Sequence, residues 1–349
     1  MPAGRLHRDN NFDVLRLAAA TLVILSHSWA LTGSVVDPVV ALTGGRLYAG
    51  ELGVWIFFAM SGYLVTDSYC KRRSLFAFLE ARALRIYPAF FVAIVFGIVV
   101  GALVTTLPLR AYFGDADTWR YLYRNLLFEL RYELPGVFAA NPFPRAVNGS
   151  IWTLPGEAMM YLLVAALGVA TLLWHRRVCG FVLAALIATI AAEPLIVTGL
   201  PRIGSPLYAL PVVSFLLGML MLLYRDRVVL HAAIAVALVA LVLIAAPHVR
   251  TAVPLYACVA GAYITFYLAF HRVRVRIPER VGDVSYGLYV YAFPTQQFVV
   301  WLVPAIGPWS LFAVAFPATF ALAWLSWHFV ERPALSLKGA LALPVPRPT

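Results

Sequence analysis

Residues 10–29 read NNFDVLRLAAATLVILSHSW, and the interpretation of the whole chain starts from this stretch. It is long and apolar enough to cross a membrane as a helix, yet it contains Arg16 and His27. On a helix these two side chains lie about 16 Å apart along the axis and about 20° apart around it, so they project from nearly the same face. Ionisable residues inside a membrane span are costly and by default mark function. We therefore expect a cation at one membrane boundary and an imidazole deep in the membrane to form the two ends of a reaction channel.

The composition is that of a polytopic membrane protein. Hydrophobic residues make up 62% of the 349-residue chain and charged residues only 12%, which excludes an ordinary soluble domain. The net charge of +11 comes from basic residues in the loops between apolar runs, which is typical of membrane topology rather than of nucleic-acid binding. The three cysteines are widely scattered and lack the spacing of metal ligands, so we expect neither a metal site nor a disulfide framework.

Apolar runs separated by charged or Pro/Gly-rich breaks predict an all-α integral membrane protein with about ten transmembrane helices. The predicted spans are residues 14–33, 50–69, 86–107, 150–173, 178–198, 207–223, 228–246, 252–270, 284–303 and 309–330. An even number of spans places both termini on one side, and the distribution of Lys and Arg makes that side the cytoplasm.

One long connection, residues 108–149, is predicted outside the membrane. Its part TWRYLYRNLLFELRYEL, residues 118–134, is amphipathic and aromatic, which favours a helix lying at the outer interface. A Pro/Asn/Gly-rich loop follows. Connections of this length usually act as lids or binding elements.

His27 is the first candidate for chemistry. It lies about 20 Å from the cytoplasmic end of its span, hence about 10 Å below the outer surface. A structural histidine bonded between helices is one interpretation. A general base is the other, because the unperturbed pKa of imidazole suits proton transfer near neutral pH.

Glu157 is predicted at the same depth, about 10 Å below the outer surface, because its span enters from outside near Ser150. A carboxylate there would fix the tautomer of His27 and stabilise its imidazolium, as the acid of a catalytic triad does. The alternative is a structural glutamate bonded to backbone groups that Pro155 frees.

Arg82 and Arg85 stand three residues apart at the predicted cytoplasmic boundary of the third span, on one helical face. A pair of converging guanidinium groups recognises phosphate well, and Arg16 is expected at the same depth. The alternatives are topology and headgroup contact for the pair, and an ion pair with Asp13 for Arg16.

Three further features have plainer interpretations. In FFAMSGY, residues 57–63, small residues are expected to let two helices approach closely; a nucleophilic Ser61 is the less favoured alternative. Asp283 precedes the ninth span and is expected to cap its helix. Glu331 marks the cytoplasmic end of the tenth span.

Six motifs, in order along the chain, resemble those of membrane acyltransferase family 3 over about residues 10–333. They are FDVLRLAAATLVILSHS, FFAMSGYLVT, RALRIYP, SIWTLPGEAMMY, VSYGLYVYAFP and FVERP. Each motif alone is weak, but six in the same order are specific. Members of this family acylate exopolysaccharides, lipopolysaccharide O-antigen, Nod factors and some antibiotics.

The resemblance implies an acyl group taken from acyl-CoA inside the cell and delivered to a hydroxyl on the outer side. His27 matches the essential histidine of the family, and Arg16, Arg82 and Arg85 match its arginine motifs. One departure is Ala292, since many members have histidine before the aromatic residue and proline of this motif. The optional fused extracytoplasmic domain of the family is also absent after residue 333.

The sequence thus predicts an O-acyltransferase of the bacterial inner membrane, with residues 10–333 as its transmembrane domain and 334–349 as a short cytoplasmic tail. Its expected co-substrate is acyl-CoA, with acetyl-CoA favoured by abundance, and its expected acceptor is a carbohydrate or lipid-linked glycan. The catalytic residues would be His27 and Glu157, and coenzyme A would bind Arg16, Arg82 and Arg85. Direct transfer and an acyl-His27 relay both remain open. The rival hypothesis is a proton-coupled transporter or flippase of a lipid-linked or acidic solute.

Overall fold

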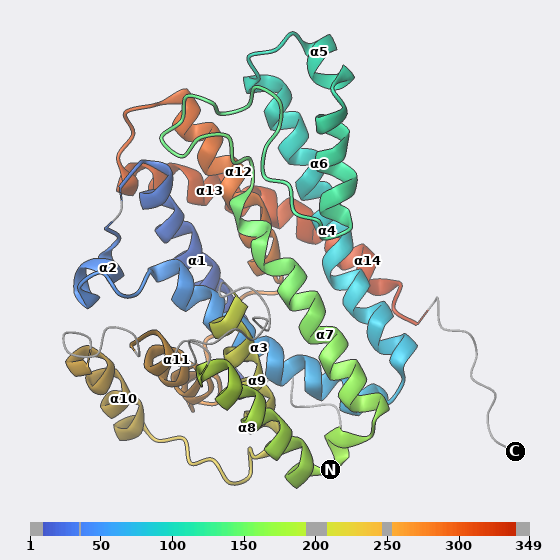
Figure 1. Ribbon diagram of the computed structural model, residues 1–349, viewed down its shortest axis with the longest axis vertical. Coiled ribbons are helices and arrows are strands. Elements are labelled where there is room, and N and C mark those ends of the chain that lie inside the picture. The colour runs from blue at the N-terminus through green and yellow to red at the C-terminus, as the bar shows by residue number, and fades with distance from the viewer. Residues whose placement is uncertain (1–9, 35, 193–207, 246–252, 340–349) are drawn as a thin grey trace, which may run out of the picture. The chain divides into compact units, whose positions relative to one another are not determined.

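The computed structural model describes residues 10–34, 36–192, 208–245 and 253–339 (Figure 1). Within these residues the regular structure is helical, apart from an isolated antiparallel bridge between Glu133 and Ala146. The predicted all-α class is therefore confirmed. Residues 193–198 of the fifth predicted span, the start of the sixth at 207, the end of the seventh at 246, the start of the eighth at 252 and residues 340–349 of the predicted tail lie outside the described residues.

The helices in chain order are α1 (Phe12–Leu31), α2 (Pro38–Thr43), α3 (Ala49–Arg72), α4 (Leu75–Val104), α5 (Leu109–Gly114), α6 (Ala116–Leu126), the 3-10 turn η1 (Gly149–Thr153), α7 (Leu154–Val169), the 3-10 turn η2 (Leu172–Trp174), α8 (Arg176–Ala192), α9 (Ala209–Leu223), α10 (Ala232–Ala245), α11 (Val253–Ala269), α12 (Ser285–Leu302), α13 (Pro308–Ser326), the π-helix η4 (Trp327–Glu331) and α14 (Arg332–Ser336).

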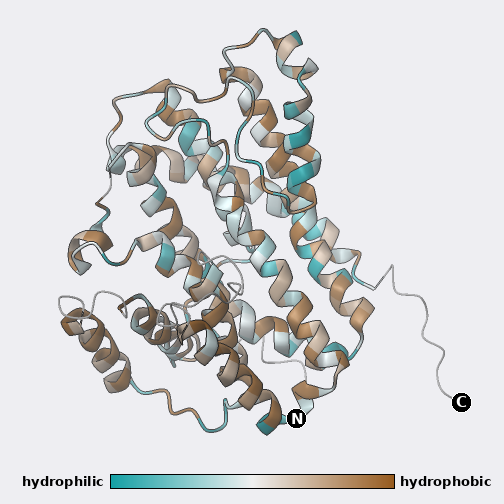
Figure 2. Ribbon diagram, viewed as in Figure 1, coloured by the Kyte–Doolittle hydropathy of each residue, from teal (hydrophilic) through white to brown (hydrophobic). Residues whose placement is uncertain are grey.

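Five helical stretches among the described residues are long and apolar enough to cross a membrane. They are Phe12–Leu31, Ala49–Arg72, Leu75–Val104, Gly149–Val169 and Pro308–Ser336. Shorter apolar helices accompany them at Ala209–Leu223, Ala232–Ala245 and Val253–Ala269. Figure 2 shows α10 and much of α8 and α9 coloured as hydrophobic along their lengths. The chain is a multi-pass membrane protein, while the count of ten spans and the cytoplasmic termini stay predictions.

Helix α4 extends beyond the third predicted span, which starts at residue 86. The helix begins at Leu75, so Arg82 and Arg85 lie within one continuous helix, as their spacing predicted. Arginine is a good helix former, and the charges here do not interrupt the helix. The amphipathic helix expected over residues 118–134 ends at Leu126, and Phe128 has a φ of 60°. A phenylalanine in that region of φ breaks helical geometry.

The chain forms two compact units. Unit 1 comprises Met1–Ala19, Pro38–Leu75 and Gly156–Ile277, and unit 2 comprises Ala20–Asp37, Phe76–Pro155 and Pro278–Thr349. Helices α1 and α7 each contribute residues to both units. Arg16 and Glu157 belong to unit 1, whereas His27, Arg82 and Arg85 belong to unit 2.

In unit 1, α3 and α9 pack backbone against backbone, with α11 beside them. A Cβ on Gly62 would lie 2.0 Å from the carbonyl oxygen of Phe215, and a Cβ on Gly218 would lie 2.1 Å from that of Ala59. Such distances tolerate no side chain. The close helix approach predicted from FFAMSGY is confirmed at Gly62.

The start of α1 is fixed within unit 1 by Asn11. The Asn11 backbone N–H donates to the Ala269 carbonyl (2.9 Å), and its side-chain amide donates to the Leu268 and Val273 carbonyls (2.8 and 2.9 Å). Its side-chain oxygen accepts from the Val275 N–H at 3.0 Å. These bonds attach the helix that carries Arg16 to the end of α11, and the buried Phe12 adds aromatic contacts at the same place.

In unit 2, α12 packs along α13, and the long connection (residues 108–149) packs on α4. The Tyr112 hydroxyl donates to the Ile98 carbonyl at 3.0 Å, next to Gly101, which leaves room for the ring. Tyr112 and Tyr121 are fully buried. Asn125 closes the segment on itself by donating to the Tyr121 and Arg131 carbonyls. The long connection is thus a packed part of unit 2 rather than a loose loop.

Candidate active site

His27 lies in the second half of α1, within unit 2. Its Nδ1 atom is buried and has no hydrogen-bond partner among the described residues. The imidazole meets the ring of Phe293 edge to face, with centroids 5.1 Å apart and planes at 79°. A buried histidine that served only to join helices would be expected to use its ring nitrogens. The unpartnered Nδ1 favours the functional interpretation of His27 over the structural one.

Phe293 of α12 brings His27 and the end of the long connection together. Phe143 contacts the Phe293 ring edge to face, with centroids 6.0 Å apart. Gly149 lies so close that a Cβ on it would stand 2.5 Å from Cε2 of Phe293. One aromatic ring therefore separates His27 from residues of the long connection.

The same helix fixes the long connection through Gln297, whose side chain is completely buried. Its amide nitrogen donates to the Phe143 and Ala146 carbonyls, both at 2.8 Å, and its oxygen accepts from Asn141 at 2.7 Å. Asn148 donates to the Val290 carbonyl at 2.8 Å, two turns before Gln297 on α12. These bonds hold the end of the long connection against the face of α12 that carries Phe293.

Gln296 is a polar residue at this site that the sequence reasoning missed. Its amide nitrogen donates to the Ile24 carbonyl (2.9 Å) and to the Ser28 hydroxyl (2.8 Å), on either side of His27 in α1. Ser28 donates its own proton to the Ile24 carbonyl, so the amide nitrogen must face α1. The Gln296 oxygen is left buried without a hydrogen-bond partner among the described residues. The signal available in the sequence was a pair of glutamines in an otherwise apolar span.

Arg85 lies in an ionic cluster in unit 2. One guanidinium nitrogen is 2.7 Å from Asp283, and the other is 3.5 Å from Glu331. Glu331, only 1% exposed, also accepts from the Ser326 hydroxyl at 3.1 Å. Glu331 is the last residue of the π-helix η4. Such π-helical turns often occur at functional sites. Asp283 therefore pairs with an arginine. The helix cap expected from Asp283 is not formed, because Val284 is the N-cap residue of α12 and has no side-chain cap hydrogen bond; Asp283 instead accepts from the Ser285 hydroxyl.

The other two arginines have different surroundings. The guanidinium of Arg82 lies 5.9 Å from the centre of the buried Phe78 ring, on the same helix as Arg85. In unit 1, Arg16 pairs with Asp13 at 2.8 Å, as the sequence suggested. Arg16 and Asp13 are partly and largely exposed, respectively, so this pair contributes little to stability.

Glu157 lies in the first turn of α7, in unit 1, and accepts a hydrogen bond from the Tyr161 hydroxyl one turn later. The pairing of Glu157 with His27 stays a prediction.

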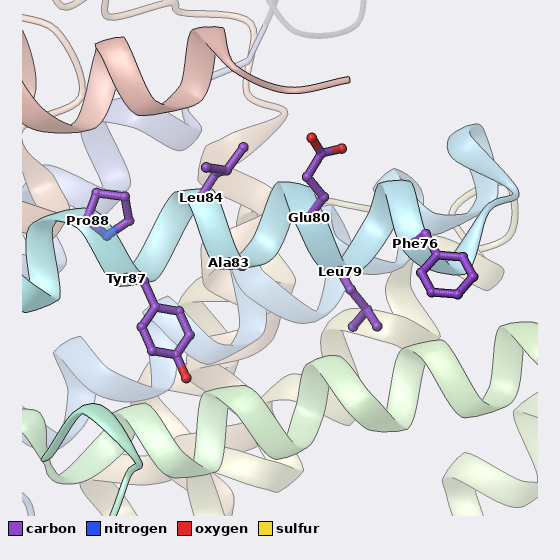
Figure 3. Close-up of a pocket in the computed structure, with 7 residues that line it drawn as sticks. All are labelled: Phe76, Leu79, Glu80, Ala83, Leu84, Tyr87 and Pro88. Carbon is purple, nitrogen blue, oxygen red and sulfur yellow. The ribbon is translucent and has the colours of Figure 1, made fainter. Parts of the chain in front are cut away.

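An apolar groove of about 510 Å³ runs along α4, lined by Phe76, Leu79, Glu80, Ala83, Leu84, Tyr87 and Pro88 (Figure 3). At about 100° per residue these side chains lie on the face of the helix opposite to Arg82 and Arg85. The groove therefore does not belong to the arginine site. In the part of the chain that the structure describes, no group of three His, Cys, Asp or Glu side chains is placed to hold a metal ion.

The fold and these residues define a multi-pass membrane protein with a half-buried histidine, whose Nδ1 atom is buried, and arginine–carboxylate contacts. Residues 9–328 match the model of the acyltransferase domain Acyl_transf_3. The chain belongs to this family and is an O-acyltransferase, as its motifs predicted.

Two characterised proteins are similar to the chain over nearly its whole length. It is 31% identical to "Nodulation protein 10" of Rhizobium leguminosarum bv. viciae, with 96% of this chain and 95% of the relative covered. It is 28% identical to the "O-acetyl transferase" of Shigella phage Sf6, with 94% and 96% covered. No solved structure matches the chain.

Proposed function

We propose that this enzyme moves an acyl group, acetyl by preference, from cytoplasmic acyl-CoA to a hydroxyl of a cell-surface or exported glycan. The bacterial inner membrane is the proposed location. The observation that carries the proposal is His27. Its buried Nδ1 has no hydrogen-bond partner among the described residues, and its ring contacts Phe293, where the long connection also packs. The name of the phage relative, an O-acetyl transferase, supports acetyl as the group.

In the proposed reaction His27 acts as general base. It accepts the proton of the acceptor hydroxyl while the hydroxyl oxygen attacks the thioester carbonyl. The carbon–sulfur bond then breaks, and the departing thiolate takes the proton back from the imidazolium. Glu157 is proposed to orient the imidazole, as an acid partner does in hydrolase triads.

The donor end of the channel is proposed at Arg16, Arg82 and Arg85, which would bind the phosphates of coenzyme A. Along α1 the separation of Arg16 and His27 is about 16 Å, comparable with an extended pantetheine arm. Asp283 and Glu331 each contact one terminal nitrogen of the Arg85 guanidinium. In this proposal the two carboxylates hold that guanidinium in a fixed place, and Arg82 and Arg16 join it in binding the phosphates.

The acceptor end is proposed at the long connection, because residues 143 and 149 reach the Phe293 ring that covers His27. The Gln296 oxygen is buried and has no partner in the part of the chain that the structure describes, so it is proposed to accept a hydrogen bond from a hydroxylated substrate near His27. Leaving such an acceptor unsatisfied costs about 1–3 kcal/mol, so a bound hydroxyl there gains affinity.

The proposal is tested in inverted membrane vesicles, which expose the cytoplasmic face to added donor. Labelled acetyl-CoA should transfer its label to the glycan or glycolipid fraction, and vesicles without the protein should not. A transporter needs no acyl-CoA and leaves no covalently changed product. If the vesicles take up a solute and no tested acyl-CoA donor gives an acylated product, the result would favour a transporter or flippase.

A further inference from the structure

A basic cavity in unit 1 lies apart from every residue assigned above. It has a volume of about 330 Å³ and lies where α8 begins and α9 ends. Its lining consists of His175, Arg176, Arg177, Val178, Tyr224 and Arg227. Three arginines therefore line the same small space as a histidine, a tyrosine and one apolar side chain.

The contact between Tyr224 and α8 forms one wall of this cavity. A Cβ on Gly180 would stand 2.2 Å from the Tyr224 hydroxyl, so the ring reaches α8 only because that position is glycine. The hydroxyl donates to the Arg176 carbonyl at 3.1 Å, and the Arg176 guanidinium lies 4.4 Å from the centre of the ring. Asp226 binds the same guanidinium through both oxygens, at 2.7 and 2.9 Å.

These contacts leave the cavity with excess positive charge. Hydrogen bonding to Arg176 lowers the pKa of Asp226, so Asp226 stays ionised and neutralises that arginine. Arg177 and Arg227 are both exposed and bring two further positive charges to the lining. A compact ligand with one or two negative charges complements this arrangement.

The surface beside the cavity is apolar. Val178, which lines the cavity, is 50% exposed, and Phe181, one turn further along α8, is 76% exposed. At about 100° per residue, Phe181 projects between the directions of Arg177 and Val178. A ligand that fits both features has an anionic head and an apolar tail that runs along α8.

We propose that this cavity binds the phosphate headgroup of an anionic phospholipid. Arg177 and Arg227 bind the phosphate, while Tyr224 and the Arg176–Asp226 pair hold the shape of the site. Basic pockets between transmembrane helices bind such headgroups elsewhere. A free phosphate or a nucleotide would use the charges but not the exposed apolar face, which is why the lipid is favoured. This site is independent of the proposed acyl transfer.

The test uses the full-length protein, purified and exchanged into phosphatidylcholine nanodiscs with increasing phosphatidylglycerol. Native mass spectrometry then counts retained phosphatidylglycerol per protein. The variant Arg177→Gln/Arg227→Gln is compared with Arg272→Gln/Arg276→Gln, which removes the same charge from exposed positions in the connection after α11. Wild type and control should retain the lipid. The cavity variant should bind it about 30-fold more weakly, since each arginine removed should cost roughly fivefold in affinity.

Two results would overturn the proposal. Equal loss in both double variants would mean that the lipid responds to overall charge rather than to this cavity. The second result has two parts: inorganic phosphate or coenzyme A stabilises the wild type but not the cavity variant against heat, and neither protein specifically retains phosphatidylglycerol. This result would assign the cavity to a soluble phosphate. The variant His27→Ala should lose acyl transfer but retain phosphatidylglycerol as wild type does. The proposed function and the proposed lipid site can therefore fail separately.

Discussion

Replacing Arg85 by alanine separates its structural contribution from its proposed role in donor binding. Glu331 is 1% exposed, and its partners are Arg85 at 3.5 Å and Ser326 at 3.1 Å. Removing the guanidinium leaves a buried carboxylate without its cation, which costs about 3–5 kcal/mol. Arg85→Ala is therefore expected to lower the free energy of unfolding by about that amount, measured by denaturant titration in detergent.

The companion variant Arg85→Ala/Glu331→Gln removes the stranded charge and keeps the shape of the side chain. It should recover part of the lost stability, with a coupling energy of about 1–3 kcal/mol between the two positions. If Arg85 also binds the donor phosphates, activity stays low and the KM for acetyl-CoA stays raised although stability returns. A loss below about 1 kcal/mol for Arg85→Ala would refute the buried ion pair, and full activity in the double variant would refute the phosphate role.

Two further changes test the surroundings of His27. Gly149→Ala should push Phe293 from its place, since the new Cβ would lie 2.5 Å from that ring, and acyl transfer should fall roughly 10- to 100-fold. The control Gly261→Ala should leave transfer unchanged, because no described atom outside its own helix lies within 4 Å of the new Cβ. Equal activity in both variants would contradict the contact between Gly149 and Phe293. Gln297→Met breaks three hydrogen bonds and should lower the free energy of unfolding by at least about 2 kcal/mol. Gln296→Met should mainly raise the KM for the acceptor. If the acceptor KM of Gln296→Met equals that of wild type, Gln296 does not belong to the acceptor site.

Hydropathy and small-residue patterns predicted much of the fold because they report local physics. Long apolar runs predicted the helices that cross the membrane, and FFAMSGY predicted the close approach at Gly62. The pairing of Arg16 with Asp13 was also expected, since residues three apart on a helix are neighbours. These features depend on spacing within one segment.

What the sequence could not provide depends on contacts between distant segments. Arg85 and Asp283 are 198 residues apart, so nothing in the spacing of Arg82 and Arg85 indicated that one of them would meet two carboxylates. Gln296 and Gln297 are neighbours of the same type. Only the fold shows that Gln297 is fully hydrogen-bonded, whereas the Gln296 oxygen has no partner within the described ranges.

The most direct test of the account compares wild type with His27→Ala and His231→Ala in inverted vesicles at equal expression, with labelled acetyl-CoA as donor. His231 is exposed and accepts a hydrogen bond from the Ala233 N–H two residues on, so it serves as the matched histidine control. The account predicts label in the glycan fraction for wild type and His231→Ala, and none above background for His27→Ala. Transfer by His27→Ala at the wild-type rate would contradict the central role of this histidine.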